Sequence, residues 1–126
     1  MSVVLDASAL LAYLQVEPGS DRVRSILDGA VMSTVNWAEV IQKVAAAGVE
    51  TAGLRRDIEI LGLGIVAFTA YQAEVAGTLS SQTRKLGLCL ADRACLALGL
   101  DRGEPVYTTD RAWKRLDIGI AIHTLH

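Results

Sequence analysis

The segment Val3-Val4-Leu5-Asp6-Ala7-Ser8, near the start of the chain, sets the expectation for the whole architecture. Its first three residues are apolar and lack the alternation of a half-buried strand, which indicates a strand covered on both faces. The strand ends at Asp6, and from Ser8 the apolar spacing becomes helical until Pro18-Gly19 interrupts it. A covered strand followed by a helix is typical of a parallel sheet between helical layers.

The rest of the chain repeats this alternation of strand and helix. Four further strands are predicted at Val31–Val35, Ile65–Phe68, Pro105–Thr108 and Ile118–Thr124. A helix that ends at Leu27 is predicted to begin at Ser20 or Asp21, either of which can cap it. Further helices are predicted from Asn36 to about Gly48, over Thr51–Leu61, from about Ala70 to Leu86, around Asp92 as far as Leu100, and over Asp110–Leu116. The expected fold is α/β, a three-layer α/β/α sandwich with a central, mainly parallel five-stranded sheet, in a single domain over residues 1–126.

Composition limits the function classes. The chain has 126 residues and a net charge of −2, so its overall charge does not mark a nucleic-acid binder, and a polyanionic substrate must be recruited locally or through metal. Cys89 and Cys95 match no metal-binding or disulfide spacing, and we expect both to be reduced core residues. Without a basic leader or an apolar run near the roughly 20 residues of a membrane span, we expect a cytoplasmic protein.

Four acidic residues stand where apolar strands or helices begin or end: Asp6, Glu39, Asp92 and Asp110. Ligands of open parallel sheets bind beyond the carboxyl ends of the strands, where Asp6 and Asp110 fall. Two ionised carboxylates about 5 Å apart repel by roughly 3 kcal/mol at an effective dielectric near 20, so four in one pocket must share protons or bind a cation. Oxygen ligands without a His or Cys cluster favour Mg²⁺ or Mn²⁺ over zinc.

Structural roles compete with this interpretation. Asp6 and Asp110 can each be a helix N-cap, a role worth roughly 1 kcal/mol, and Glu39 can form a variant capping box with Asn36. Asp92 sits in the early part of its helix, where the macrodipole favours a negative charge. It has no obvious capping role, however, because it lies several residues inside an apolar stretch where an unpartnered carboxylate is costly. We therefore favour a functional use of Asp92.

Four segments carry a family resemblance. They are Val4-Leu5-Asp6-Ala7-Ser8-Ala9-Leu10, Ser33-Thr34-Val35-Asn36-Trp37-Ala38-Glu39-Val40, Leu90-Ala91-Asp92-Arg93-Ala94-Cys95-Leu96-Ala97 and Val106-Tyr107-Thr108-Thr109-Asp110-Arg111-Ala112-Trp113. In their order and spacing they resemble PIN-domain ribonucleases, specifically VapC-type toxins of type II toxin–antitoxin pairs. The resemblance covers essentially the whole chain and implies a PIN-like fold.

The resemblance also implies roles for single residues. Asp6, Glu39, Asp92 and Asp110 match the acids that bind divalent metal and catalyse RNA hydrolysis in that family. As a hypothesis, Asp6 and Asp92 hold the principal Mg²⁺, for which Mn²⁺ can substitute, while Glu39 and Asp110 complete the site or position the attacking water. Ser8 and Thr108 match small hydroxyl residues that support the acids.

Partners follow from the same resemblance. It implies an RNA substrate, a homodimer and a cognate VapB-like antitoxin whose C-terminal segment covers the acidic site, often with an Arg on the carboxylates. Four basic residues next to the acids in sequence are candidates for contacts to flanking phosphates, Arg93 and Arg111 first, then Lys114 and Arg115. Ordinary solvation of helix faces explains each of them equally well.

Three other function classes make their own demands on the sequence. A phosphatase on a similar sheet needs an Asp-x-Asp pair, where this chain has Asp6-Ala7-Ser8. A phosphoacceptor receiver domain needs an Asp after the third strand, where this chain has Phe68-Thr69-Ala70. A non-catalytic PIN-like module that docks a basic peptide in the acidic pocket stays open, because docking and catalysis would use the same carboxylates.

Overall fold

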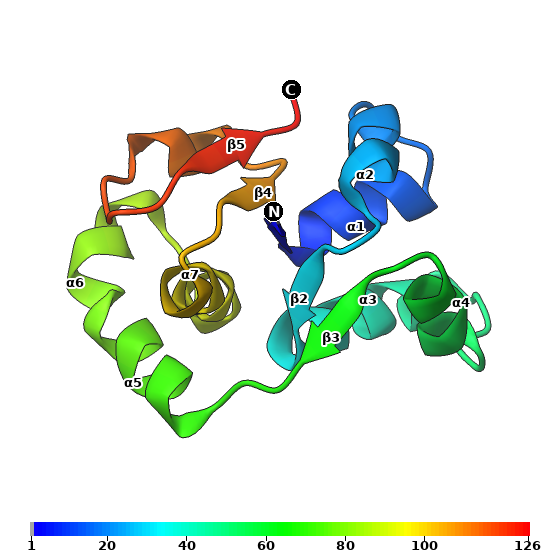
Figure 1. Cartoon of the computed structure of the whole chain (residues 1–126), viewed down its shortest axis with the longest axis horizontal. Coiled ribbons are helices and arrows are strands. Elements are labelled where there is room, and N and C mark those ends of the chain that lie inside the picture. Colours follow the sequence, from blue (N-terminus) through cyan, green and yellow to red (C-terminus); the bar gives the residue numbers. More distant parts are fainter. Residues whose placement is uncertain (1) are drawn as a thin grey trace.

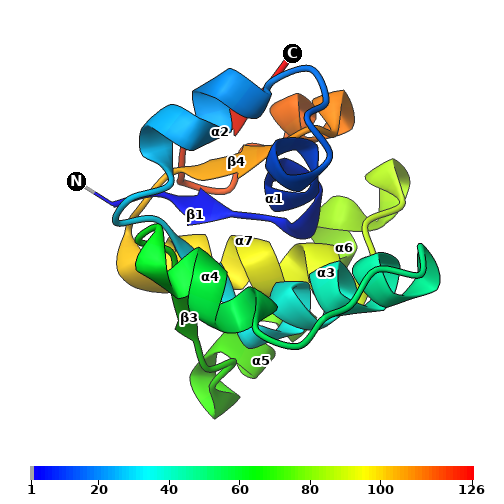
Figure 2. The same ribbon diagram turned by 90° about the vertical axis from the view of Figure 1, so that its right-hand side faces the viewer.

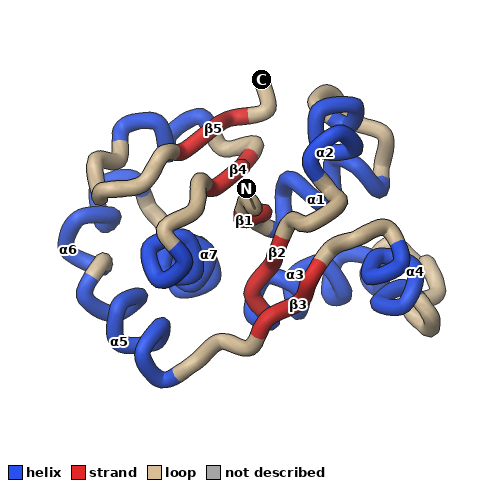
Figure 3. The backbone as a smooth tube through the Cα atoms, in the orientation of Figure 1, coloured by secondary structure: helices blue, strands red, loops and turns tan. Residues whose placement is uncertain are grey.

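The computed structural model describes residues 2–126, and a five-stranded sheet lies at its centre (Figures 1 and 3). The strands are β1 (Val4–Leu5), β2 (Val31–Ser33), β3 (Gly64–Val66), β4 (Val106–Thr108) and β5 (Ile122–Thr124). Their order is β3-β2-β1-β4-β5, and each neighbouring pair is parallel. The predicted α/β fold with a five-stranded parallel sheet is confirmed.

Helices cover both faces of the sheet, with α1 to α4 on one side and α5 to α7 on the other (Figure 1). They are α1 (Ala7–Leu14), α2 (Ser20–Ile26), α3 (Thr34–Ala46), α4 (Leu54–Ile60), α5 (Ala70–Thr78), α6 (Ser80–Thr83) and α7 (Leu90–Arg102), with the 3-10 turns η1 (Arg84–Leu86) and η2 (Arg111–Arg115). Within residues 2–126, none of these helices has the length and apolar character needed to cross a membrane.

Two apolar clusters sandwich the sheet. Leu5 of β1 packs in a cluster with residues of α1, α2, α3 and α4, such as Leu10 and Val23. Its neighbour Val4 packs in a second cluster with Leu96 of α7 and with β4. Because successive side chains of a strand point to opposite faces, β1 is covered on both sides, which is why its sequence shows no alternation.

The order of the strands creates one reversal point. After β1 the chain builds outward through β2 and β3, then crosses back to place β4 on the other side of β1. β1 and β4 pair in the register Leu5 with Tyr107, so Asp6 comes level with Thr108 where both strands end. Figure 2 shows β1 and β4 side by side. Ligands of open parallel sheets bind at such a point.

The N-caps of α3 and α2 differ from the predictions. α3 begins at Thr34 rather than Asn36, because Ser33 is its N-cap and the Ser33 hydroxyl accepts a hydrogen bond from the Val35 amide at 3.2 Å. α2 is preceded by Gly19 in the left-handed conformation, with no side-chain cap, so the expectation that Ser20 or Asp21 caps it is wrong.

The single helix predicted from about Ala70 to Leu86 is divided into α5, α6 and η1. Near the divisions, the Thr78 hydroxyl donates to the carbonyl of Val75 at 2.8 Å and the Thr83 hydroxyl donates to that of Leu79 at 2.9 Å. Hydroxyls that bond to carbonyls of the preceding turn compete with the helical hydrogen bonds and bend helices.

Two further predictions need correction. β5 begins at Ile122 rather than Ile118, because Gly119 at φ +97° takes a left-handed conformation that an extended strand does not contain. Cys95 is buried as expected, but Cys89 is exposed at the start of α7 and is no core residue.

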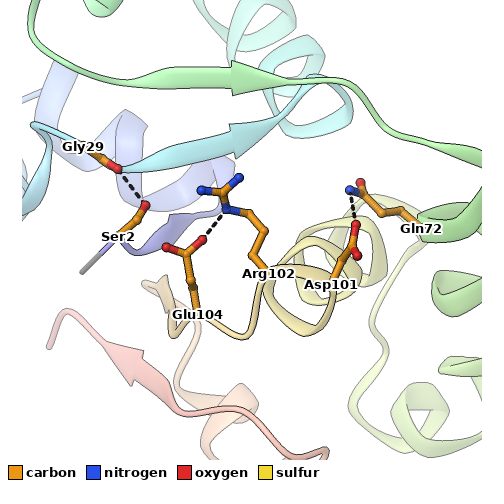
Figure 4. A network of polar contacts seen from close by, with 6 residues as sticks. All are labelled: Ser2, Gly29, Gln72, Asp101, Arg102 and Glu104. Atoms are coloured by element: carbon orange, nitrogen blue, oxygen red, sulfur yellow. Dashed lines mark hydrogen bonds and ion pairs between the residues drawn. The ribbon is translucent and has the colours of Figure 1, made fainter.

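Charged groups at the end of α7 and before β4 have partners within the fold (Figure 4). Arg102, at the end of α7, forms an ion pair with the buried Glu104, just before β4. Nearby, the buried Gln72 donates a hydrogen bond to Asp101 at 2.9 Å. The opposite edge differs, because within residues 2–126 no basic group lies within ion-pair distance of the four predicted site acids.

Candidate active site

A cavity of about 270 Å³ lies at the carboxyl ends of β1 and β4. The residues that line it are Asp6, Ala7, Ser8, Glu39, Lys43, Asp92, Thr109, Asp110 and Trp113. The structure thus brings together all four acids singled out in the sequence, although they come from four separate segments. Asp6, Asp92 and Asp110 stand at the beginning of a helix or 3-10 turn, whereas Glu39 lies inside α3.

Asp6 is the N-cap of α1 and the most deeply buried of the four acids, at 5% exposed. Its Oδ1 accepts hydrogen bonds from the Ala9 amide at 2.9 Å and the Ser8 hydroxyl at 2.7 Å. Its Oδ2 accepts from the Thr108 hydroxyl at 2.6 Å. The N-cap prediction is confirmed, and Ser8 and Thr108 hold the carboxylate from two sides.

The pKa of Asp6 rises from 3.8 to about 6. Burial is the largest cause, because it removes water from the charged form. The bonds from Thr108, Ser8 and Ala9 act in the opposite direction, and the negative charge of Asp92 adds to the rise. Asp6 therefore takes up a proton more readily than an ordinary Asp, as expected of a carboxylate in a pocket of other acids.

Asp92 has a structural role that its sequence context did not reveal. α7 begins at Leu90, so Asp92 occupies the third helical position, and its Oδ2 accepts a hydrogen bond from the Cys89 amide at 3.0 Å. This is the return half of a capping box. The prediction that Asp92 lacks a capping role is wrong, because the apolar residues Leu88 and Cys89 before it precede α7 rather than belong to it.

Glu39 is oriented by Asn36 rather than capped with it. Ser33 is the N-cap and α3 begins at Thr34, so the variant capping box predicted for Asn36 and Glu39 is not formed. Instead, the Asn36 Nδ2 donates to Glu39 Oε1 and to the Ala91 carbonyl, each at 3.0 Å. Asn36 is 1% exposed and therefore joins α3 to the first turn of α7. The residue types alone carried no signal for this link, because Ala91 is 55 residues away.

Asp110 is the most exposed of the four acids that line the cavity. As predicted, it is an N-cap, of the 3-10 turn η2, and its Oδ1 accepts from the Ala112 amide at 3.0 Å. The Asp110 amide donates to the Thr108 hydroxyl at 3.1 Å, and the Thr109 amide donates to the Ser8 hydroxyl at 3.0 Å. The two hydroxyls of the site thus connect the ends of β1 and β4 directly.

The negative charges of the site also affect a buried cysteine in the core. Cys95, fully buried on α7, has a pKa raised well above its usual value. Burial is the largest cause, followed by the charges of Asp6, Asp92 and Glu39. This thiol stays protonated, and three of the four acids act on the same buried point.

The acidic side chains that line the cavity suit a hard divalent cation, because carboxylate oxygens are the ligands that such ions prefer. Among residues 2–126, however, no three Asp, Glu, His or Cys side chains converge closely enough to form a metal site by themselves. An ion here needs water ligands beside one or two carboxylates, which is the ordinary coordination of Mg²⁺ in proteins.

The structure places the predicted basic residues away from the cavity lining. The Arg93 Nη1 donates to the Ala76 carbonyl at 2.9 Å, and the Arg111 Nε donates to the His126 carbonyl at 3.0 Å. The basic residue that lines the cavity is Lys43, for which no role was predicted. A signal existed in the sequence, because Lys43 follows Glu39 by four residues, and this spacing puts two side chains on one helix face.

The sequence matches the PIN domain family over residues 3–119. No curated protein sequence matches the chain. Similar solved structures include a toxin–antitoxin complex from Klebsiella pneumoniae, at 16% identity, 98% coverage of both chains and a TM-score of 0.77. FitAcB from Neisseria gonorrhoeae and VapBC-1 from nontypeable Haemophilus influenzae are each 19% identical, over 99% of this chain and 98% of theirs, with TM-scores of 0.72 and 0.70. At such identities the likeness shows a shared fold.

Proposed function

The chain belongs to the PIN domain family, and we propose that it is a metal-dependent endoribonuclease, the toxin of a toxin–antitoxin pair. The observation that carries this proposal is the convergence of four carboxylates on one cavity at the reversal point of the sheet. The solved structures of similar fold that are toxin–antitoxin complexes support the assignment to a toxin. The proposed reaction is hydrolysis of an RNA phosphodiester bond.

Mg²⁺ is the proposed cofactor, with Mn²⁺ as a substitute. Asp6 and Asp92 are its proposed principal ligands, which is supported by the effect of the Asp92 charge on the pKa of Asp6. Glu39 and Asp110, which line the same cavity, are proposed to complete the site or to position the attacking water. A bound ion neutralises charge on the phosphate and makes a water molecule more acidic.

The chain's own groups have separable proposed tasks. Ser8 and Thr108 keep the Asp6 carboxylate in one orientation, because each donates to a different oxygen. Asn36 does the same for Glu39 by donating to one of its oxygens and leaving the other available. Asp110 is exposed at the edge of the cavity, where it can accept a proton from an attacking water.

Arg93 and Arg111 remain proposed contacts to phosphates farther along the RNA strand. Arg111 is exposed and adjoins Asp110, which supports this role. Arg93 is half-buried and already donates to a backbone carbonyl, so any contact must use its remaining N–H groups. Neutralising a residue that contacts phosphate reduces the salt dependence of RNA binding.

An antitoxin partner and a homodimer are also proposed, together with a cytoplasmic location. The similar complexes support a VapB-like antitoxin. The cavity offers four carboxylates without a basic partner in ion-pair distance among residues 2–126, so an Arg from a partner can pair with them bidentately. Inhibition then replaces the positive charge of the metal ion by that of the Arg.

An assay of purified, antitoxin-free protein on an RNA pool tests the function. We expect cleavage that requires Mg²⁺ or Mn²⁺ and is lost with EDTA. Asp6→Asn is expected to lower the rate at least 100-fold, since a metal ligand is removed while Asn still caps α1. Full activity of Asp6→Asn contradicts the proposed site, and absence of cleavage by the wild-type protein favours the peptide-docking module.

A further inference from the structure

Lys43 occupies a distinctive position in the charge pattern of the molecule. It is the one basic side chain, among residues 2–126, that lines the acidic cavity. It lies on α3 one turn after Glu39, which lines the same cavity. Lys43 is solvent-exposed, so its side chain stands at the mouth of the cavity rather than in its depth.

The ammonium group of Lys43 has no partner in the part of the chain that the structure describes. The ion pairs within residues 2–126 are Arg55 with Glu59 and Arg102 with Glu104, so no carboxylate lies within 4.0 Å of Lys43. Among residues 2–126, no hydrogen bond involves the Lys43 side chain either. This distinguishes Lys43 from Arg93 and Arg111, both of which donate to backbone carbonyls. Its three N–H donors are therefore available to a ligand.

A substrate phosphate meets two opposing charges at this cavity. The four lining carboxylates repel it, and a cation bound between Asp6 and Asp92 would attract it only at the centre of the site. A fixed positive charge at the mouth lowers the repulsion that the neighbouring part of the RNA backbone experiences on entry. Of the lining residues, only Lys43 can supply that charge.

We propose that Lys43 binds a phosphate of the RNA backbone at the mouth of the acidic cavity and thereby holds the strand against the catalytic carboxylates. This inference rests on the proposed ribonuclease function and adds to it a substrate-binding residue. The alternative role of Lys43 is only to maintain the shape of the site, without contact to the RNA. The two roles predict different consequences for RNA and for the metal ion.

Removal of the positive charge separates the two roles. If Lys43 contacts phosphate, its loss weakens RNA binding while it strengthens cation binding, because one positive charge near the carboxylates is gone. If Lys43 only maintains the shape of the site, its loss weakens the binding of both ligands. The test therefore compares RNA affinity with Mn²⁺ affinity in the same variants.

The variants are Lys43→Met, Lys43→Arg and, as a matched control, Lys85→Met. Lys85 is an exposed lysine on η1 that lines a different cavity with Gln82 and Arg115, so its substitution removes the same charge elsewhere. Binding of a fluorescent single-stranded RNA is measured by anisotropy in Ca²⁺ at several KCl concentrations. Mn²⁺ affinity is measured by calorimetry without RNA, and cleavage in Mn²⁺ is recorded separately.

For Lys43→Met we expect RNA affinity to fall roughly 10- to 100-fold, the range of one charge-assisted hydrogen bond. The slope of log K against log [salt] should decrease by about 0.7, the value for one phosphate contact on a single strand. Mn²⁺ affinity should stay equal or rise, and Lys43→Arg should retain most RNA affinity. Lys85→Met should show none of these changes.

Equal effects of Lys43→Met and Lys85→Met on RNA affinity and salt slope would overturn the inference, and so would a parallel loss of RNA and Mn²⁺ affinity in Lys43→Met. A wild-type protein that binds RNA but does not cleave it contradicts the ribonuclease function while the binding comparison still decides the role of Lys43. A wild-type protein that binds no RNA contradicts both.

Discussion

At Asp6, burial and hydrogen bonding have opposite effects on the pKa of the carboxyl group. Three donors, from Ser8, Ala9 and Thr108, stabilise its charged form, yet desolvation outweighs them and raises its pKa to about 6. Near neutral pH the carboxylate therefore holds its charge at a cost in folding free energy. A cation beside it removes that cost, so metal binding should release protons and stabilise the fold.

The pKa of Asp6 predicts a dependence of stability on pH. In metal-free protein the folded state binds a proton that the unfolded state has lost, between pH 3.8 and about 6. Stability thus falls as the pH rises through this window, by on the order of 3 kcal/mol in total, and the loss persists above it. Asp6→Asn should therefore raise the free energy of unfolding at pH 7.5 and show no such gain below pH 4.

Urea unfolding in EDTA across this pH range measures the effect. Glu74→Gln, which neutralises an exposed acid on α5, is the control and should change little at any pH. In excess Mn²⁺ the wild-type protein should become more stable than Asp6→Asn, because it gains more free energy from metal binding than the variant does. A gain from Asp6→Asn of the same size at pH 4 and pH 7.5 would contradict the pKa assignment.

At the scale of elements, the start of α7 combines two tasks. Asp92 accepts the Cys89 amide hydrogen bond that begins the helix, and it also lines the cavity. Asn36 joins this same turn to α3 through the Ala91 carbonyl. The ends of α3 and α7 are therefore held together by the side chains that position the acids, so local helix stability and site geometry depend on the same contacts.

Two substitutions of Asp92 should separate its tasks. Asp92→Asn keeps an acceptor for the Cys89 amide and should cost only the helix-dipole contribution, about 0.3–0.5 kcal/mol. Asp92→Ala also loses the hydrogen bond and should cost about 1–1.5 kcal/mol. Both should weaken Mn²⁺ binding to a similar extent. Urea unfolding and calorimetry measure the two quantities, and equal stability of the two variants would rule out the capping role.

At the scale of the whole molecule, α7 packs unusually close to the sheet at one glycine. A Cβ at Gly99 would lie 2.6 Å from Val106 Cγ2 and 2.9 Å from Ile120 Cδ1. Gly99 therefore sets the separation between α7 and β4, the two elements that carry Asp92 and the Asp110 loop.

A matched pair of glycine substitutions tests this packing. Gly99→Ala should destabilise the protein by about 1–3 kcal/mol, because the β-branched Val106 has few ways to move. Gly77→Ala, on α5, meets no atom within 4 Å and should stabilise it by about 0.5–1 kcal/mol through lower unfolded-state entropy. Thermal unfolding of both variants provides the measurement. A stabilising Gly99→Ala would show that α7 is not so closely packed.

Much of the architecture could be predicted because short apolar runs and helical spacing are local properties. Val3-Val4-Leu5 indicated a strand covered on both faces, and the strand and helix alternation indicated parallel pairing. The boundaries of helices were harder to predict from the sequence where a single side chain determines them. The Ser33 cap lets α3 begin at Thr34, two residues before the predicted start at Asn36. The Thr78 and Thr83 hydroxyls form hydrogen bonds near the points where the helix expected over residues 70–86 is divided.

By itself the sequence determined the α/β class, the parallel sheet and the identity of the four acids, because these follow from local patterns and from residue types at the ends of strands and helices. Only the tertiary structure decided which residues contact or surround these four acids. It assigned Asp92 a cap, linked Asn36 to α7, kept Arg93 and Arg111 out of the cavity lining and brought Lys43 into it. Such contacts join residues far apart in the chain, and their geometry depends on how the layers pack.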